Sequence, residues 1–139
     1  NNDNTEIVFR RVDTPSLIRF KESMGIVRFP VGETVIYQNS VLFFKMGDGT
    51  TDSIDFSKSP KWKQILESFL ELRKRAEETH FTPVEVMNMH NQLFGEAIER
   101  RYLAQQISNI RNKKIKNELK GRFKIGFDKP QNAWIFTLY

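Results

Sequence analysis

The sequence predicts an α+β fold in which antiparallel β-strands come first and three helices and a C-terminal β-hairpin follow. Three observations indicate this class. Residues 1–57 contain short runs of β-branched and aromatic residues separated by turn residues, the pattern of a small antiparallel sheet. Helix-start signals and helically spaced apolar residues replace that pattern afterwards, and two alternating runs end the chain. We therefore expect a β-rich segment at 1–57 and a second domain at 58–139.

Five runs in the first segment have the composition of strands. They are EIVFRRV (6–12), GIVRFP (25–30), ETVIYQ (33–38), VLFFKM (41–46) and SIDF (53–56). Turn residues separate the last three runs, which favours a meander of neighbouring strands. Residues 14–25 also fit a short helix that Thr14 would cap and Gly25 would end, and the sequence leaves that element open.

The first helix of the second domain has a clear start. Ser59 precedes Pro60, and proline suits the first turn of a helix because no backbone N–H is needed there. Apolar residues at helical spacing then predict a helix from about 60 to 78. We expect three aromatic residues to lie in the core, rather than to stack on single-stranded nucleic acid: Trp62, Phe69 and Trp134.

A capping box marks the start of the second helix. The side chains of Thr82 and Glu85 each accept a hydrogen bond from a backbone amide that the helix leaves unpaired. Gly95 ends this helix, because glycine readily adopts the left-handed conformation found after a helix. The residues expected to face inward are Val86, Met87, His90, Leu93 and Phe94.

A third helix, at 100–119, and a β-hairpin, at 122–138, complete the domain. The buried stripe of the helix is Leu103, Ile107 and Ile110. Ile115 and Leu119 lie off this stripe, so either the helix bends near 112–114 or these residues pack against the hairpin. Three helices followed by a hairpin is the order of a winged helix-turn-helix domain, in which the hairpin is called the wing.

Basic residues are concentrated near the C-terminus. Residues 1–57 hold six Lys or Arg and eight Asp or Glu, whereas residues 100–129 hold ten basic residues and two acidic ones. Positive charge on one face attracts polyanions far better than the same charge spread evenly. No acidic residue lies between Glu99 and Glu118, so the third helix lacks the Glu–Lys pairs of an ordinary solvated helix. This distribution indicates nucleic acid as the partner.

The third helix carries hydrogen-bonding side chains opposite its apolar stripe. Arg and Lys pair well with guanine, and Asn and Gln with adenine, in the major groove of DNA. We expect base contacts from Arg101, Gln105, Ser108, Asn109 and Asn112. We expect phosphate contacts from Arg100, Arg111, Lys113, Lys116, Lys120, Arg122, Lys124 and Lys129. The sequence thus predicts a module for double-stranded DNA, with its third helix in the major groove and the hairpin on the backbone.

Two segments of the chain are similar to a known family. They are LAQQISNIRNKKI (103–115), which matches a pattern of Ile-Ser-x-Leu-Arg-x-Lys before the wing, and SIDFSKSPKWKQILESFLEL (53–72). In both, the chain resembles the DNA-binding effector domain of the OmpR/PhoB group of bacterial regulators. The resemblance covers roughly residues 33–139. It implies an N-terminal antiparallel sheet, three helices, a wing and a role in transcription regulation.

Other uses of this fold stay open. One is a protein–protein interaction domain whose sheet half contacts a partner, and another is the DNA-binding domain of a replication or mobile-element protein. Lysine is depleted at protein interfaces, so the charge favours DNA.

We expect a cytoplasmic protein, since no apolar run approaches the roughly 18 residues of a membrane span. A homodimer stays open. The start at Asn1 rather than methionine suggests a piece of a longer protein with further domains.

No enzyme site stands out, and we expect no catalytic residue, cofactor or metal. His80 and His90 lie on different elements, and we expect His90 to be buried. The stretch 47–55 lacks the alternating ligands of a calcium loop, so a polar turn explains it more simply. Its carboxylates are Asp48, Asp52 and Asp55. For nuclease chemistry the best candidates are Glu33 and Lys45, on strands expected to be adjacent.

Overall fold

The computed structural model describes residues 27–76 and 78–139. The chain divides into two units, Asn1–Glu33 and Thr34–Tyr139. The second unit contains three helices and two small antiparallel sheets among its described residues, so the α+β class is confirmed. This unit begins well before residue 57, where the sequence predicted a boundary, and it therefore includes the first sheet.

Part of the predicted N-terminal structure is not covered. The predicted strand at 6–12 and the helix at 14–25 lie outside the described residues. The predicted strand at 25–30 is wrong in its described part, from residue 27 onwards, which has no regular structure. These residues instead lead into a tight turn, in which the backbone N–H of Glu33 donates to the carbonyl of Pro30 at 2.9 Å.

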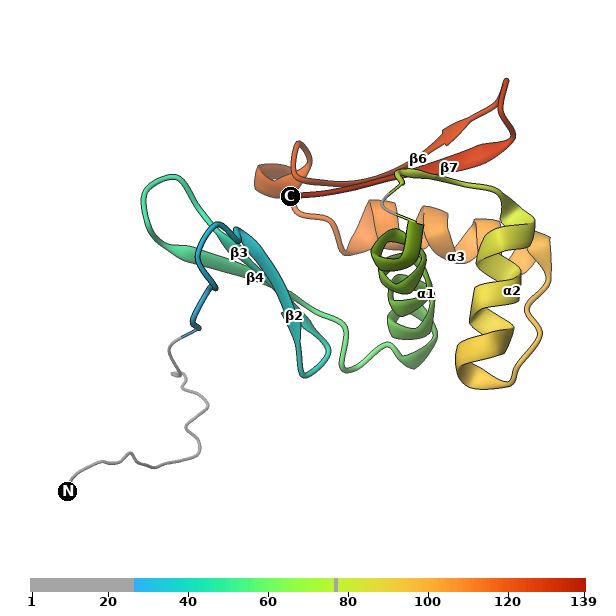
Figure 1. Cartoon of the computed structure of the whole chain (residues 1–139), viewed down its shortest axis with the longest axis horizontal. Coiled ribbons are helices and arrows are strands. Elements are labelled where there is room, and N and C mark those ends of the chain that lie inside the picture. Colours follow the sequence, from blue (N-terminus) through green and yellow to red (C-terminus); the bar gives the residue numbers. More distant parts are fainter. Residues whose placement is uncertain (1–26, 77) are drawn as a thin grey trace. The chain divides into compact units, whose positions relative to one another are not determined.

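The first sheet is a meander of three antiparallel strands, β2 (Val35–Gln38), β3 (Val41–Lys45) and β4 (Thr51–Asp55), in that order (Figure 1). Asn39 and Ser40 join β2 to β3 and have φ angles of 53° and 68°. Two positive φ angles in succession give the turn whose twist matches that of the flanking strands. The prediction of neighbouring strands here is confirmed.

The strand β4 begins two residues earlier than the predicted run at 53–56, because Thr51 pairs with Lys45 across the sheet. One face of the sheet lies on the core. Its buried side chains are Leu42, Phe44 and Ile54, and Phe56 is buried directly after β4.

The next segment is α1 (Pro60–Ala76), β5 (His80–Phe81) and α2 (Pro83–Phe94). The predicted first helix is confirmed over Pro60–Ala76, and residue 78, its expected end, lies outside the helix. The capping box between Thr82 and Glu85 is also confirmed, with both of its hydrogen bonds present. The short strand β5 was not predicted, because two residues are too few to show an alternating pattern.

The inward face of α2 differs in part from the prediction. Val86 and His90 are buried as expected, and Gly95 ends the helix in the left-handed conformation, with φ 65°. Leu93 was expected to face inward but is 38% exposed, whereas Met89 is only 5% exposed. Met89 and Leu93 are four residues apart and share one helix face, but Leu93 lies in the last turn of α2, where the helix ends at Phe94.

The predicted helix at 100–119 is confirmed up to Lys113 and wrong beyond it. α3 spans Arg100–Lys113, and a separate 3₁₀ turn, η1 (Asn117–Leu119), follows. The amide of Ile115 donates to the carbonyl of Ile110 at 3.3 Å, which closes the end of α3 with a wide turn. At 100° per residue, a continuing helix would carry Ile115 and Leu119 to the exposed face. Because the helix ends, both side chains are buried instead.

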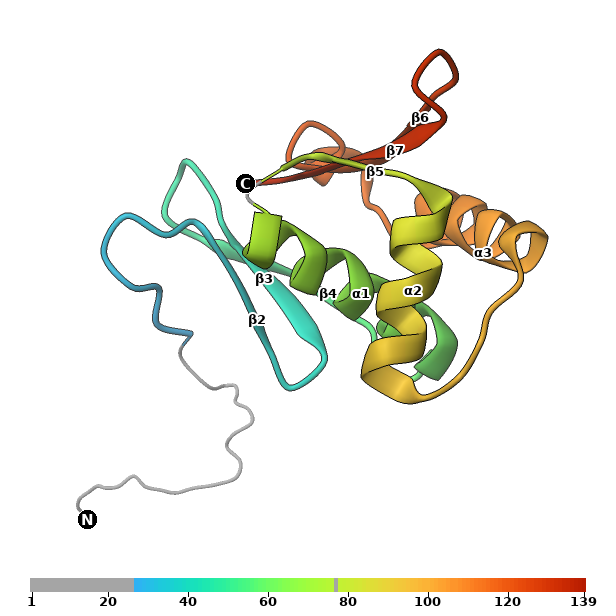
Figure 2. The ribbon, with the colours of Figure 1, turned by 45° about the vertical axis from the view of Figure 1, so that its right-hand side comes forward.

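The second sheet has the order β5–β7–β6, with all neighbours antiparallel (Figure 2). The strands β6 (Phe123–Asp128) and β7 (Ala133–Leu138) form the predicted hairpin. Four aromatic rings connect this sheet to α1. They are Phe69, Phe81, Trp134 and Phe136, all of them buried.

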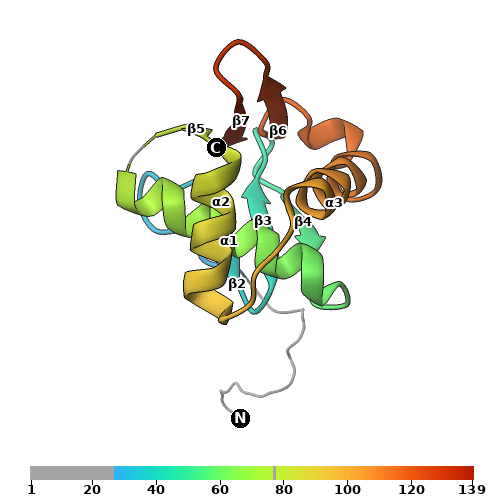
Figure 3. The same cartoon turned by 90° about the vertical axis from the view of Figure 1, so that its right-hand side faces the viewer.

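The three helices pack together beneath the hairpin. α1 contacts both α2 and α3, and α3 contacts β6 (Figure 3). Trp62, at the start of α1, is half-buried, and its Nε1 donates to Gln106 of α3 at 2.7 Å. Phe69 and Trp134 are core residues, as predicted. Among residues 27–76 and 78–139, none of the helices is long and apolar enough to cross a bilayer.

Candidate nucleic-acid interface

One face of α3 is polar, exposed and largely free of internal bonds. Its other face is fixed to the core by Leu103, Ile107 and Ile110. Of the predicted base-contacting residues, the exposed ones are Arg101, Gln105 and Asn112, and the half-buried ones are Ser108 and Asn109. In the described part of the chain, the side-chain hydrogen bonds of α3 involve Arg100, Gln106 and Arg111, and none involves those five residues. Their donors and acceptors are therefore available to a ligand.

Half of the predicted phosphate-contacting residues are lysines with no ion pair among the described residues, and we call them the unpaired lysines. They are Lys113, Lys120, Lys124 and Lys129, and all four are exposed. Among residues 27–76 and 78–139, the ion pairs involve other side chains. An exposed lysine without a partner breaks no internal bond when its side chain turns to an external anion. These four are therefore the best-placed cations for a polyanion.

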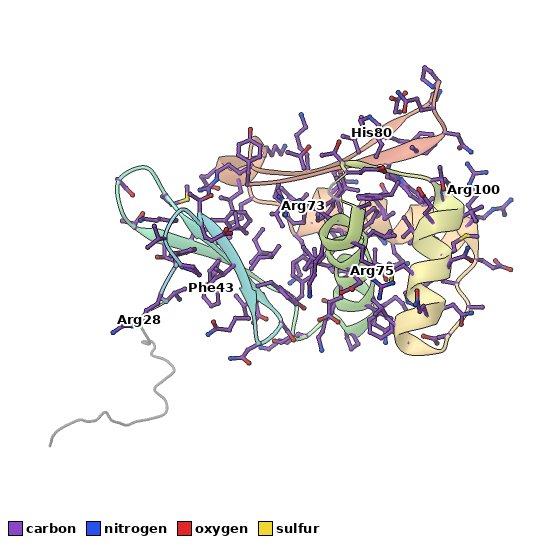
Figure 4. All side chains as sticks on the ribbon, viewed as in Figure 1. Arg28, Phe43, Arg73, Arg75, His80 and Arg100 are labelled. Carbon is purple, nitrogen blue, oxygen red and sulfur yellow. The ribbon has the colours of Figure 1, made fainter. Side chains whose placement is uncertain are left out.

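Two of the predicted phosphate-contacting arginines connect α3 to the hairpin. Arg100, at the start of α3 (Figure 4), donates to the side-chain oxygen of Asn132 at 2.9 Å, in the hairpin turn. Arg111, in the last turn of α3, donates to the backbone carbonyl of Ile125 in β6. The two bonds lie at opposite ends of α3 and hold the hairpin alongside it. Each guanidinium keeps other N–H groups that can reach a ligand.

Arg122 is engaged inside the domain. Its guanidinium donates to three backbone carbonyls, those of Tyr139 at 2.7 Å, Lys45 at 2.8 Å and Thr34 at 3.0 Å. It also lies over the ring of Phe44, 5.3 Å from the centroid. These contacts join the start of β6 to the first sheet. The structure therefore gives Arg122 an internal role, whereas the sequence suggested a phosphate contact.

Two lysines after α3 connect to the strand β4. Lys116 forms an ion pair with Asp52, with 2.7 Å between Nζ and Oδ1. Lys114 donates to the backbone carbonyl of Asp55, also at 2.7 Å. The hydrogen bond from Lys116 lowers the pKa of the Asp52 carboxyl, with a smaller contribution from the amide of Ser53. Lys116 is thus less available to phosphate than the four unpaired lysines.

We expect Asp52→Asn to remove a small, pH-dependent part of the stability. Because the pKa of Asp52 is lower in the folded state, its carboxylate stabilises the fold above the unfolded-state pKa of about 3.9. This contribution is lost as the pH falls through the folded-state pKa. Since Lys116 is 46% exposed, the free energy of unfolding at pH 7 should fall by at most about 1 kcal/mol. Urea unfolding at pH 7 and pH 3 measures it, and the difference between variant and wild type should be smaller at pH 3 than at pH 7.

The control for this experiment is Glu118→Gln, which removes an exposed carboxylate next to the same lysines. It should change the free energy of unfolding by less than about 0.5 kcal/mol at either pH. Equal losses in the two variants at pH 7 would show that the pair with Lys116 adds nothing beyond general charge.

A groove lies between the end of α3 and β6, and we call it the α3–β6 groove. Its volume is about 360 Å³. Its polar lining is Arg111, Asn112, Lys120 and Lys124, and its apolar lining is Ile115, Phe123, Ile125 and Gly126. The sequence predicted the basic residues as separate phosphate contacts but not the apolar floor. The alternation along β6 was a usable signal, because Phe123 and Ile125 share the inward face.

Two of the residues considered for enzyme chemistry have structural roles, Asp48 and His90. The carboxylate of Asp48 accepts from the amide and hydroxyl of Thr50, which closes the β3–β4 turn. His90 is buried as predicted, with Nδ1 2.9 Å from the carbonyl oxygen of Glu96. The expected strand position of Glu33 is wrong, because β2 begins at Val35. Within the described ranges, no three His, Asp or Glu residues group closely enough to hold a metal ion.

The interface therefore combines three features on α3, the segment after it, β6 and the β6–β7 turn: a polar helix face, four exposed lysines with no ion pair among the described residues, and a basic groove with an apolar floor. Side chains of these types contact both base edges and phosphates in protein–DNA complexes. No protein-family model matches the sequence, and neither a curated protein nor a solved structure matches it.

Proposed function

We propose that the chain is a winged helix-turn-helix DNA-binding module. The observation that carries this proposal is the exposed face of α3, where five hydrogen-bonding side chains without internal partners in the described residues lie next to unpaired lysines. In this proposal α3 enters the major groove, and the β6–β7 hairpin, as the wing, lies on the backbone. Arg101, Gln105, Ser108, Asn109 and Asn112 contact bases.

The order of the elements supports this architecture. α1, β5, α2 and α3 precede the β6–β7 hairpin, and β5 pairs with the outer side of β7. The sheet braces the hairpin from one side, while Arg100 and Arg111 hold it alongside α3 from the other. A helix used to contact bases must be held rigidly, because base contacts depend on geometry.

We also propose that the module acts as a transcription regulator of the OmpR/PhoB type. The support is the resemblance at 103–115 together with a three-stranded sheet preceding the first helix. A role in replication or in a mobile element would use the same interface. In each case double-stranded DNA is the partner, and we expect the protein to be cytoplasmic.

Fluorescence anisotropy with labelled duplex DNA tests the proposal. Each neutralised phosphate lowers the slope of log K against log salt by about 0.9, so four lysine contacts give a slope of about −4. We therefore expect measurable binding at 50 mM salt and a steep loss by 200 mM. An absence of duplex binding at low salt, or binding that hardly responds to salt, would overturn the proposal.

We expect Gln105→Ala to relax sequence preference. Gln105 is exposed and lies one turn before Asn109, so the two side chains can address neighbouring base pairs. A bidentate contact provides about 1–3 kcal/mol of discrimination against the wrong base. After selection of a preferred site from random duplexes, the variant should lose this discrimination at one position while its non-specific affinity and salt slope stay unchanged.

Gln92→Ala is the matched control, because Gln92 is an exposed glutamine on α2. It should leave both the preferred site and the affinity unchanged. If Gln105→Ala instead weakened binding equally to every sequence, α3 would contact the backbone alone.

A protein-contact role is a second candidate, and one surface favours it. A groove of about 540 Å³ lies between β2, α1 and the end of α2. Its apolar lining includes Leu70, Phe94 and the partly exposed Leu93. The hydroxyl of Tyr37 donates to Glu67 at 2.5 Å on the same surface, and burial together with that carboxylate raises the pKa of Tyr37. This role and DNA binding use different surfaces and can coexist.

A further inference from the structure

We propose that the α3–β6 groove binds one phosphodiester unit of the DNA backbone, with the phosphate at its basic rim and the deoxyribose towards its apolar floor. This inference rests on the proposed function. It goes further in assigning a single phosphate to a built site and in fixing where that phosphate lies relative to the bases contacted by α3.

The rim of the groove provides cations that no described residue neutralises. Lys120 and Lys124 are exposed, and no side chain in the described part of the chain pairs with them. They approach the groove from two separate segments, the turn after η1 and the strand β6. Convergent lysines from two segments can contact one anion at the same time.

Arg111 is held in place at this rim. One of its terminal nitrogens donates to the carbonyl of Ile125, so the guanidinium already lies across the gap between α3 and β6. The remaining N–H groups of a guanidinium oriented in this way suit a phosphate oxygen, because a planar fork matches phosphate geometry. Asn112, the next residue, adds an exposed amide donor to the lining.

The floor of the groove is apolar. It is formed by Ile115, Phe123 and Ile125, each at most 8% exposed. A free inorganic anion gains nothing from such a floor, whereas the carbon face of a deoxyribose can pack on it. The groove holds about 360 Å³, at the lower end of small-molecule pockets. This volume suits a sugar and its phosphate, and it is too small for a protein helix, which is 10–12 Å across.

The position of the groove predicts which phosphate it binds. It lies at the Asn112 end of α3, eleven residues and about 16 Å from Arg101. The bound phosphate must therefore flank the base pair nearest Asn112. The phosphate near Arg101 must be a different one.

Scanning with methylphosphonates tests this assignment, because each replaces one phosphate by an uncharged group. The duplex carries the selected site, and binding is measured for wild type and for the double variant Lys120→Ala/Lys124→Ala. In wild type, one neutralised position beside the Asn112 base pair should weaken binding by roughly tenfold, the low end for a charge-assisted hydrogen bond. In the double variant, neutralising that same position should cause little further loss.

The control variant is Lys58→Ala/Lys74→Ala, which removes two exposed lysines outside the groove. It should keep the wild-type pattern at every position. Both double variants could still bind the duplex and lose the same affinity at every methylphosphonate position. That result overturns the groove assignment and leaves the proposed function intact. Binding without a preferred register also overturns the assignment, since no single phosphate is then fixed. A wild-type protein that does not bind duplex at low salt overturns both.

Discussion

Replacing Phe69 by alanine should lower the free energy of unfolding by about 3–5 kcal/mol, the usual cost of deleting a buried phenylalanine ring. Phe69 is fully buried in α1 and stacks on Phe136 of β7, with 5.0 Å between ring centroids. The centroid of its ring also lies 6.3 Å from the ring centroids of both Phe81 and Trp134. The side chain therefore joins α1 to two strands of the second sheet, and its loss leaves a cavity that rigid neighbours cannot fill.

Urea unfolding followed by far-UV circular dichroism measures this loss. The matched control is Val84→Ala in α2, where the side chain is 60% exposed and the change should stay within about 0.5 kcal/mol. A loss below about 1 kcal/mol for Phe69→Ala would mean that the helices and the hairpin do not share one core.

Some elements could be predicted because their signals are local. The start and end of α2 depend on Thr82, Glu85 and Gly95, all of which act within the helix or at its ends. The exposed face of α3 was predicted for the same reason. Three apolar residues fix the buried side, and the remaining positions follow from helical geometry.

Other elements could not be predicted, because distant contacts decide them. Nothing between Lys113 and Leu119 stops a helix strongly, since this stretch has neither proline nor glycine. The helix ends there because Ile115 and Leu119 are buried in the domain core, which the sequence does not show. The strand β5 likewise exists only because Phe81 pairs with Trp134, 53 residues later.

The basic residues of the candidate interface also fall into two groups, those whose role the sequence could predict and those whose role it could not. Lys120 and Lys124 stay exposed as predicted, because nothing in the described residues competes for them. Lys116 and Arg122 look equivalent to them in the sequence, yet both have internal partners. Lys116 pairs with a residue 64 positions away, and two of the three partners of Arg122 are 77 and 88 positions away, so no pattern within the basic stretch could separate the two kinds of residue.

We expect Arg122→Ala to lower the free energy of unfolding by roughly 1–2 kcal/mol, because its hydrogen bonds lie near the surface, where water can replace the lost donor. A hydrogen bond from a charged group contributes roughly 1.5–3 kcal/mol, and three such bonds to one guanidinium are not additive. The carbonyls of Thr34, Lys45 and Tyr139 would lose their donor, and Phe44 would lose the cation above its ring. Arg122→Lys should recover only part of the loss, because an ammonium group cannot reproduce the planar fork of donors.

The same substitution distinguishes an internal role from a phosphate contact. At a temperature where the variant is still folded, Arg122→Ala should leave the slope of log K against log salt unchanged, since Arg122 neutralises no phosphate in our proposal.

Lys124→Ala should behave in the opposite way, because its side chain is exposed and has no partner among the described residues. It should leave the free energy of unfolding within about 0.5 kcal/mol of wild type and reduce the magnitude of the salt slope by about one. Urea unfolding and anisotropy on the same two proteins measure both quantities. A reduced slope with unchanged stability in Arg122→Ala would show that Arg122 contacts phosphate. Its bonds to the first sheet would then not be what connects that sheet to the hairpin.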